Sequence, residues 1–359
     1  AQKNVAELGL TNCEFLCQDL NTTQTNQQKF DYIICHGLYS WVAPETSSKI
    51  LELCQALLTD HGVAYISYNT TPGWTTRQKV RESLLTKIDR TLSKEAQMQQ
   101  AIELMQAVLK ERGPSADYED LLIAEEINNI LSLSPALIYH ELLAEHSRAF
   151  AFSAFSAELK KYNLHFLLEA NLRRNSTDWG QLTKTFGSEW RDRLIELEQA
   201  VDQKTNRSFR GSLIIRAEHI PILTIPDISQ HTKQLQLSSN LVSEQSVDLH
   251  SNEPAIFYSS AFGGQKISTR LSKSILQQLA IAWPNSCPYS ELLTLAKHSL
   301  PDLSPTEIAS ALKEISSFFW RGLIELDLTP IHCAKNSGKL FAPACYEATL
   351  RTWVTNQRH

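Results

Sequence analysis

The sequence of 359 residues predicts an α/β domain, then a mainly helical region, and a small unit of helices with β-structure at the end. Three patterns support this fold class. Short apolar runs alternate with a helical pattern in residues 1–76, and apolar residues then recur at helical spacing. Three amphipathic helices precede an alternating strand near the C-terminus. Near-continuous apolar strands separated by a helix favour a parallel sheet that is covered on both faces.

The first domain contains three predicted strands and one helix. The strands are CEFLCQDL, residues 13–20, FDYIICH, residues 30–36, and VAYISYN, residues 63–69. Between the second and third strands, an amphipathic helix begins at Pro44 and ends at Gly62. Because the carboxyl ends of parallel strands lie at one edge of a sheet, this order places the ends of the three strands at the same edge.

Composition divides the remainder of the chain into three segments. Residues 77–228 are predicted to be mainly helical, and residues 229–255, rich in Ser, Gln and Asn, are predicted to be a linker. Residues 256–359 form the last domain, in which Ser304 as N-cap and Pro305 begin the third helix. Three helices followed by a β-element are typical of winged-helix domains, so this domain is predicted to be winged-helix-like.

Charge and composition disfavour several classes of protein. The formal net charge is -5, and residues 284–328 contain three basic against six acidic side chains, whereas a phosphate-binding surface needs the opposite balance. No apolar run approaches the roughly 18–20 residues of a membrane span, and the first residues lack a signal-peptide pattern. Seven cysteines without a CxxC pair fit a reducing, cytoplasmic compartment. We expect neither nucleic-acid binding nor membrane insertion.

Polar side chains stand at the ends of the three predicted strands, namely Asp19, His36 and Asn69. In a parallel α/β sheet, ligands bind outside the carboxyl ends of the strands. A single Asp at a strand end is most often a cap or turn residue, but three consecutive strands with such side chains favour a shared site. His140 and His146 lie six residues apart, which is the wrong spacing for a zinc motif on one helix, and no metal site is predicted.

Aromatic residues accompany two of these strand ends. HGLYSW contains Gly37, Tyr39 and Trp41, and YNTTPGW contains Tyr68 and Trp74. Such rings often pack in the core beneath a helix, and such a glycine often serves only a tight turn. Together they predict an aromatic, uncharged pocket, which attracts ammonium or sulfonium groups by about 0.5–2 kcal/mol. It would also lower the pKa of an entering lysine and so make a nucleophilic amine available.

These stretches resemble a known family. EFLCQDL, FDYIICHGLYSWV and HGVAYISYNTTPGW are similar to the central and later strands of class I S-adenosylmethionine-dependent methyltransferases. HGLYSWV with YNTTPGW resembles, more narrowly, the bacterial methyltransferases with a methyltransferase regulatory domain, among them rickettsial lysine methyltransferases that act on outer-membrane proteins. YHELL, NLHFLLEANL and NRSFRGSLI are similar to that regulatory domain. The resemblance implies an incomplete Rossmann-like sheet, a helical regulatory domain and a winged-helix-like C-terminal domain.

The resemblance also implies S-adenosyl-L-methionine as cofactor and assigns residues to it. Asp19 and Leu20 match the segment that approaches the adenine, and His36 and Gly37 match the segment that lines the methionine part and the transferred methyl. Four residues would face the acceptor amine: Tyr39, Trp41, Tyr68 and Asn69. The implied partner is a protein substrate that presents lysine, with a homodimer as one arrangement of the enzyme. The lysine nitrogen would displace the methyl group in line, with positioning and desolvation supplying most of the catalysis.

The chain departs from the family pattern at its start. The Gly-rich loop after the first strand and the acidic residue after the second are absent, and the chain begins just upstream of the third strand, as if inside a fold. Because the first two strands lie between the third and fourth in this fold, we expect no proper sheet and poor or no cofactor binding. Two alternatives stay open: a non-catalytic interaction or regulatory protein with a degenerate Rossmann-like half, and a methyltransferase of a small molecule.

Overall fold

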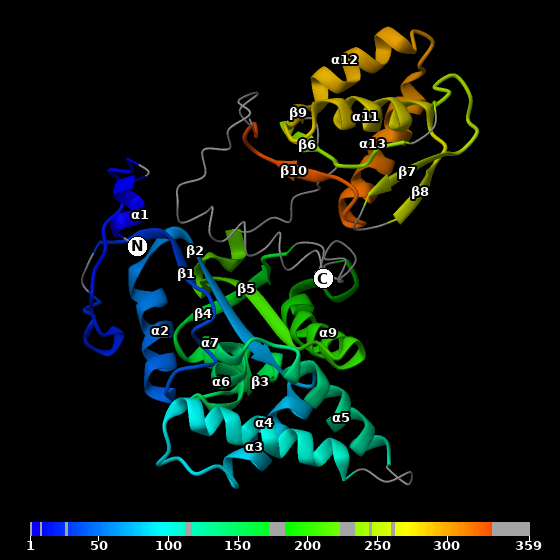
Figure 1. The fold of residues 1–359 in the computed structure, drawn as a ribbon. Coiled ribbons are helices and arrows are strands. Elements are labelled where there is room, and N and C mark those ends of the chain that lie inside the picture. Colours follow the sequence, from blue (N-terminus) through cyan, green and yellow to red (C-terminus); the bar gives the residue numbers. More distant parts are fainter. Residues whose placement is uncertain are drawn as a thin grey trace. The chain divides into compact units, whose positions relative to one another are not determined.

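The computed structural model describes residues 2–7, 9–25, 28–111, 117–171, 184–222, 234–243, 246–259 and 263–331 (Figure 1). They belong to two units, one within Asp19–Ile225 and the other within Ala1–Gln18 and Pro226–His359. Each unit has its own apolar core, so each is described by itself.

A five-stranded sheet forms the centre of the unit within Asp19–Ile225 (Figure 1). Its strands are β1 (Phe30–Cys35), β2 (Leu58–Thr70), β3 (Ala149–Phe150), β4 (Leu164–Glu169) and β5 (Phe209–Arg216). The order is β1-β2-β5-β4, with β3 paired to β2. Strands β1 and β3 run parallel to β2, whereas β5 is antiparallel to both β2 and β4. The sheet is therefore mixed. The parallel pairing predicted for the strands of the first domain is confirmed for β1 and β2.

Helices surround this sheet and continue into a second apolar cluster. They are α2 (Pro44–Leu57), α3 (Thr75–Leu85), α4 (Lys94–Lys110), α5 (Tyr118–Leu131), α6 (Pro135–Leu143), α7 (Phe152–Lys161) and α9 (Trp190–Thr205), with the 3-10 turns η1 (Leu20–Thr22), η3 (Gly187–Glu189) and η4 (Ala217–Ile222). Residues of β1, β2, β4, β5, α2, α7 and α9 share one core. Helices α3 to α6 bury a core of their own. The predicted helix 44–62 ends earlier, because the buried Leu58 already begins β2.

The predicted boundary at position 76 does not separate two compact units. Strands β4 and β5, from the region predicted to be mainly helical, complete the sheet that β1 and β2 begin. Six residues of β2, from Ala64 to Asn69, pair with Ile214 to Phe209. The physical reason is that β2 has an edge on the far side from β1, and its backbone groups find their partners in β5.

Residues 13–20 form no strand, contrary to the prediction. Their side chains are exposed except for Leu20, and no described strand pairs with them. A run of apolar residues does not by itself form a strand, because the backbone N–H and C=O groups of a strand need hydrogen-bond partners on a neighbouring strand. Five other strands pair into a sheet, but residues 13–20 take no part in it. The expected cover on both faces is missing at β1, where Tyr32 and Ile34 are 76% and 74% exposed.

The second unit contains the three predicted helices and two small sheets. The elements are α1 (Gln2–Glu7), β6 (Gln236–Ser238), β7 (Ala255–Ser259), β8 (Gly263–Ile267), α11 (Arg270–Ala282), β9 (Cys287–Pro288), α12 (Tyr289–Ser299), α13 (Pro305–Trp320) and β10 (Glu325–Asp327). Strands β7 and β8 pair antiparallel, and β6 lies between β10 and β9. Ser304 is the N-cap of α13, as the sequence predicts, and it forms a capping box with Glu307. The winged-helix character of this unit stays a prediction.

The predicted linker 229–255 is partly built into this second unit. Its strand β6 is central in a three-stranded sheet, and Leu237 and Leu241 are fully buried. Such a strand is too short to show a period in the sequence, and its polar neighbours conceal it. Residues 332–359, the end of the predicted C-terminal domain, lie outside the described part of the chain.

Candidate functional site

The turn after β1 presents His36 and Gly37 to solvent. The Nδ1 atom of His36 lies 3.1 Å from the Tyr65 hydroxyl and 3.3 Å from Ser67 Oγ. The Gly37 N–H donates to Ser67 Oγ at 2.8 Å. Gly37 has φ +63°, and no atom lies within 4 Å of the place a Cβ would take. The turn is therefore tied to β2 and yet open to the approach of a ligand, which fits the assigned contact with a cofactor.

Tyr39 and Tyr68 lie in the core. They are 2% and 1% exposed, and their ring centroids are 6.4 Å apart. Both rings also contact Phe150 and Phe155. Burial raises the pKa of both phenols, so neither hydroxyl ionises at neutral pH. Packing under a helix, the ordinary role of such rings, accounts for what the structure shows of them, and their contact with an acceptor stays a prediction.

Trp41 brings the ends of β1 and β2 together with α6. Its ring lies 6.2 Å from that of Trp74 and 4.1 Å from that of His140. The guanidinium carbon of Arg77 lies 4.9 Å from the centroid of the Trp74 ring. The Trp74 ring therefore already faces a cation of the protein itself, and the aromatic pocket for a ligand cation stays a prediction.

Asn69, near the end of β2, is 4% exposed. Its backbone N–H donates to Ser40 Oγ at 2.9 Å, which joins it to the loop after β1. Its side-chain nitrogen Nδ2 is buried and has no hydrogen-bond partner in the described chain. Buried polar atoms are nearly always paired, so this nitrogen is an exception.

Asp19 and Leu20 lie apart from these residues. Asp19 caps the turn η1, and its Oδ1 accepts from the backbone and side-chain nitrogens of Asn21 at 2.9 and 3.2 Å. Asn21 in turn donates to Thr46 Oγ1, at the start of α2. Leu20 packs on the sheet core. The capping role that is common for a lone Asp is thus seen here, and none of the described contacts of Asp19 reaches His36.

A pocket of about 480 Å³ lies beside Trp74. One wall is the turn after β2 and one side of α3, and the other is the extended segment 147–150, which contains β3. Its lining residues are Thr71, Trp74, Thr75, Gln78, Lys79, Glu82, Ser147, Arg148, Ala149 and Phe150. The volume lies within the roughly 300–1,000 Å³ of small-molecule sites. The sequence directs attention to Trp74 but contains no signal for the second wall.

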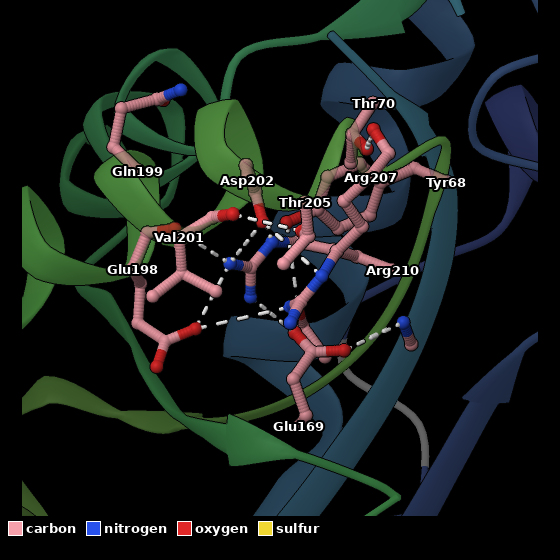
Figure 2. Close-up of polar contacts among 12 residues, drawn as sticks. Tyr68, Thr70, Glu169, Glu198, Gln199, Val201, Asp202, Thr205, Arg207 and Arg210 are labelled. Carbon is pink, nitrogen blue, oxygen red and sulfur yellow. Dashed lines mark hydrogen bonds and ion pairs between the residues drawn. The ribbon is translucent and has the colours of Figure 1, made fainter. Parts of the chain in front are cut away.

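A buried ion network surrounds Arg210 of β5, which has no exposed surface (Figure 2). Its Nη1 donates to Glu169 at 2.7 Å, its Nη2 to Glu198 at 2.9 Å and its Nε to Asp202 at 2.8 Å. The guanidinium carbon also lies 4.1 Å from the ring centroid of Phe152. Burial opposes the charge of Arg210, but the hydrogen bond to Asp202 and the neighbouring charges prevail and raise its pKa.

The carboxylates of this network have further partners. Glu169 accepts from the Gly211 N–H and from Ser212 Oγ, both at 3.1 Å. Arg207 Nε lies 3.3 Å from Asp202. Sequence reasoning missed the network because its members come from β4, α9 and β5. Its only local signal is the four-residue spacing of Glu198 and Asp202, which places both on one face of α9.

The loop before β5 also holds the turn that bears Trp74. The carbonyl oxygen of Arg207 accepts from Thr70 Oγ1 at 2.8 Å (Figure 2). It also accepts from the Gly73 N–H at 3.0 Å. A Cβ on Gly73 would lie 2.4 Å from the carbonyl oxygen of Asn206. Only two residues separate Arg207, which accepts these hydrogen bonds, from Arg210 of the ion network. The close fit therefore connects the network to the edge of the pocket.

Neither metal ligands nor membrane spans stand out in the parts of the chain that the structure describes. No three His, Cys, Asp or Glu side chains there are grouped so that they could hold a metal ion. Among the described helices, none combines the length and the apolar character that crossing a membrane requires.

Residues 134–216 match the family model of a predicted methyltransferase regulatory domain. This range begins at the N-cap of α6 and ends with β5, so it includes the whole Arg210 network. The chain therefore contains a methyltransferase regulatory domain.

The relatives are bacterial. Protein RP789 of Rickettsia prowazekii is 27% identical over 100% of this chain and 66% of its own length. The structure of PKMT2 from Rickettsia typhi is 23% identical, with a TM-score of 0.78 over 93% of this chain and 65% of that one. PKMT2 in complex with AdoHcy gives a TM-score of 0.77 over 94% and 66%. The chain has the fold of PKMT2 and spans about two thirds of the length of both relatives.

Proposed function

We propose that this chain belongs to an S-adenosylmethionine-dependent methyltransferase that methylates lysine side chains of proteins. The observation that carries this proposal is the open His36–Gly37 turn at the end of β1, in a fold shared with a structure that was solved with AdoHcy. PKMT2 is a protein lysine methyltransferase, which supports a protein acceptor. The regulatory domain supports the same class of reaction.

The residues at the strand ends have distinct tasks in this proposal. S-adenosylmethionine, when bound, supplies a methyl group on a positively charged sulfur. Gly37 lets a ligand approach the backbone, and His36 is oriented through Nδ1 by Tyr65 and Ser67. Trp41 keeps water from the acceptor, which lowers the pKa of an entering lysine so that its nitrogen carries a free electron pair.

A transfer assay tests the proposal. The protein as its gene encodes it is incubated with methyl-labelled S-adenosylmethionine and bacterial lysate, which is then separated into proteins and small molecules. We expect label in proteins, on lysine by mass spectrometry, and a loss of at least about tenfold in His36→Ala, as is usual when a positioning contact is removed. His61→Ala is the control, because His61 is also exposed and lies at the other end of β2.

Other outcomes identify the alternatives. Label only among small molecules would favour a small-molecule acceptor, and no label in either fraction would contradict the proposal. A non-catalytic interaction or regulatory role is the second candidate, and the burial of Tyr39 and Tyr68 supports it. Calorimetry with S-adenosylmethionine on the 359-residue chain tests the separate expectation of poor binding, which a micromolar Kd would contradict.

A further inference from the structure

His36 has one ring nitrogen bound to the protein and one that is open to a ligand. Its Nδ1 atom lies 3.1 Å from the Tyr65 hydroxyl and 3.3 Å from Ser67 Oγ. The two nitrogens of an imidazole point to opposite sides of the ring, so Nε2 is directed away from these hydroxyls. None of the described hydrogen bonds reaches Nε2, and the residue is exposed. Nε2 is therefore the polar atom that this side chain presents to a ligand.

The two hydroxyls decide which nitrogen carries the hydrogen of a neutral His36. Ser67 is 1% exposed, and its Oγ accepts from the Gly37 N–H at 2.8 Å, so its own hydrogen needs an acceptor. Among the described contacts, the acceptor within reach is Nδ1 of His36. A hydrogen on Nδ1 would leave the buried Ser67 hydrogen unpaired, whereas a bare Nδ1 accepts from the hydroxyls. The hydrogen of the neutral ring therefore belongs on Nε2.

Gly211 of β5 makes room for the Tyr65 hydroxyl. A Cβ at this position would lie 2.8 Å from that hydroxyl and 2.9 Å from Cε2 of the same ring. The Gly211 N–H donates to Glu169 at 3.1 Å, so its backbone is held by a member of the buried ion network. The His36 ring stacks on Tyr65, with the ring centroids 5.8 Å apart. The regulatory-domain range 134–216 thus supports the turn after β1 through one glycine.

An N–H donor at Nε2 selects the group that His36 binds. It fits a hydrogen-bond acceptor, most strongly an anionic one, and is unsuited to a positively charged group. S-adenosylmethionine has a positively charged sulfur, an ammonium group and a single anionic group, the carboxylate of its amino-acid part. A nitrogen that already carries a hydrogen accepts no proton from lysine, so this tautomer gives His36 the role of a binding residue.

We propose that His36 binds the carboxylate of S-adenosylmethionine through Nε2–H, and that Tyr65, packed over Gly211, is the positioning residue that maintains this tautomer. The inference rests on the proposed function, because it names the part of the cofactor that the turn binds. Ser67 bonds both the Gly37 N–H and Nδ1, so the backbone and the side chain of the turn are fixed together.

Nuclear magnetic resonance of the 359-residue chain labelled with ¹⁵N-histidine tests the tautomer without any ligand. At about pH 8.5, above the ordinary pKa of imidazole, the ¹⁵N shifts show which ring nitrogen carries the hydrogen. The signals of His36 are assigned by their loss in His36→Ala. We expect its hydrogen on Nε2 alone, whereas the exposed His298, whose ring forms no described hydrogen bond, should show an average of both tautomers.

Variants at the two hydroxyls should release the ring. Tyr65→Phe combined with Ser67→Ala removes both partners of Nδ1, and the His36 signals should move toward the average seen for His298. The other histidine signals show whether this variant is folded. Tyr32→Phe, at an exposed tyrosine of β1, is the matched control and should leave the His36 signals unchanged. A hydrogen on Nδ1 in the unchanged chain, or averaged signals there, would overturn the inference.

Calorimetry on the protein as its gene encodes it tests the carboxylate contact. AdoHcy contains the amino-acid part, and methylthioadenosine lacks it. We expect His36→Ala to weaken AdoHcy binding at least about tenfold, because a hydrogen bond to a charged group is lost, and to leave methylthioadenosine binding nearly unchanged. His36→Gln, whose side-chain amide also donates, should lose less. Equal effects on the two ligands, or no effect on either, would contradict the contact.

A double-mutant cycle tests the support from Gly211. Gly211→Ala displaces the Tyr65 hydroxyl, and we expect this variant and Tyr65→Phe each to weaken AdoHcy binding about threefold. Because the glycine acts through that hydroxyl, Gly211→Ala should have no further effect in the Tyr65→Phe protein. Independent effects, about ninefold in the double variant, would show that Gly211 does not act through Tyr65.

The two proposals fail separately. Methyl transfer to lysine, together with AdoHcy binding that is insensitive to His36→Ala, contradicts only the carboxylate contact. A single Nε2–H tautomer and AdoHcy binding that depends on His36, but without methyl transfer, contradict only the proposed enzyme.

Discussion

The Arg210 network and the pocket beside Trp74 are two polar regions of the same unit with opposite designs. Arg210 uses all three guanidinium nitrogens on three buried carboxylates. Among the residues that line the pocket, four buried polar atoms lack partners in the described chain, namely Trp74 Nε1, Gln78 Oε1, Ser147 Oγ and Arg148 Nε. A complete network holds strands and helices in place, whereas buried polar atoms without partners cost free energy. Hydrogen-bond accounting alone therefore separates the two regions.

The regions also differ in where their residues come from. The network lies within the regulatory-domain range 134–216. The pocket has one wall in that range, residues 147–150, and another on α3, outside it. The domain thus provides its own internal support and half of a pocket, and the turn at Gly73 connects the two.

The largest expected effect comes from breaking the network. Arg210→Met leaves three carboxylates buried without their main partner, and we expect the free energy of unfolding of this unit to fall by about 3–5 kcal/mol. Urea denaturation measures it, with hydrogen exchange in β4 and β5 as the local reading. Arg193→Met, which breaks an exposed pair with Glu196, should cost no more than about 1 kcal/mol. Similar losses of unfolding free energy in the two variants would show that the buried network stabilises this unit no more than an exposed ion pair does.

The turn between the regions comes next. Gly73→Ala pushes a methyl group into the backbone of Asn206 and Arg207, and we expect a loss of about 2–3 kcal/mol. Gly37→Ala meets no atom and pays only for its left-handed backbone, about 1 kcal/mol. Thermal denaturation of both variants ranks them. A larger loss of stability in Gly37→Ala than in Gly73→Ala would mean that the loop before β5 moves easily to make room for the added methyl group.

Two serines give the most direct test of the difference between paired and unpaired buried polar atoms. Ser212 Oγ donates to Glu169 and lies 3.3 Å from the Tyr68 hydroxyl, so Ser212→Ala should cost about 1–2 kcal/mol. Ser147 Oγ has no partner in the described chain, so Ser147→Ala should change stability by less than about 0.5 kcal/mol or increase it. Chemical denaturation compares them. A loss in Ser147→Ala equal to that in Ser212→Ala would show that the pocket is as complete as the network.

The smallest effect concerns the thiols beneath the open turn. Burial raises the pKa of Cys35, at the end of β1, to about 11 and that of Cys54 to about 12. At pH 8 we therefore expect iodoacetamide to modify the exposed Cys13 and Cys17 and to leave these two unmodified. Mass spectrometry of the native protein checks this. Fast labelling of Cys35 would show that the core under His36 opens readily.

Local features of this chain could be predicted from its sequence. The stripe of α2, the strand 30–35 and the cap at Ser304 are visible in a few adjacent letters, because helices and caps depend on neighbours in the chain. His36 and Trp74 were selected for the same reason, since His36 lies at the end of a recognisable strand and Trp74 in the turn that follows another. The error at residues 13–20 shows the limit of this reasoning, because a strand also needs a partner.

The candidate site depended on contacts between distant parts of the chain. Tyr39 and Tyr68 stand in the same sequence pattern as His36, yet α7 covers the first two and leaves His36 exposed. No local pattern carries that difference, because burial is set by what packs against a residue. Arg148 was not singled out at all, since a lone arginine in a loop has no signature.

The sequence alone determined the helices, the principal strands and their polar ends, because these follow from the order of apolar and capping residues within a few turns. Only the tertiary structure decided the mixed sheet, the partners of Arg210 and the unpaired atoms at the Trp74 pocket. The physical reason is that pairing and its absence are properties of two surfaces. A hydrogen-bond donor is the same letter in the sequence whether or not the fold brings it a partner.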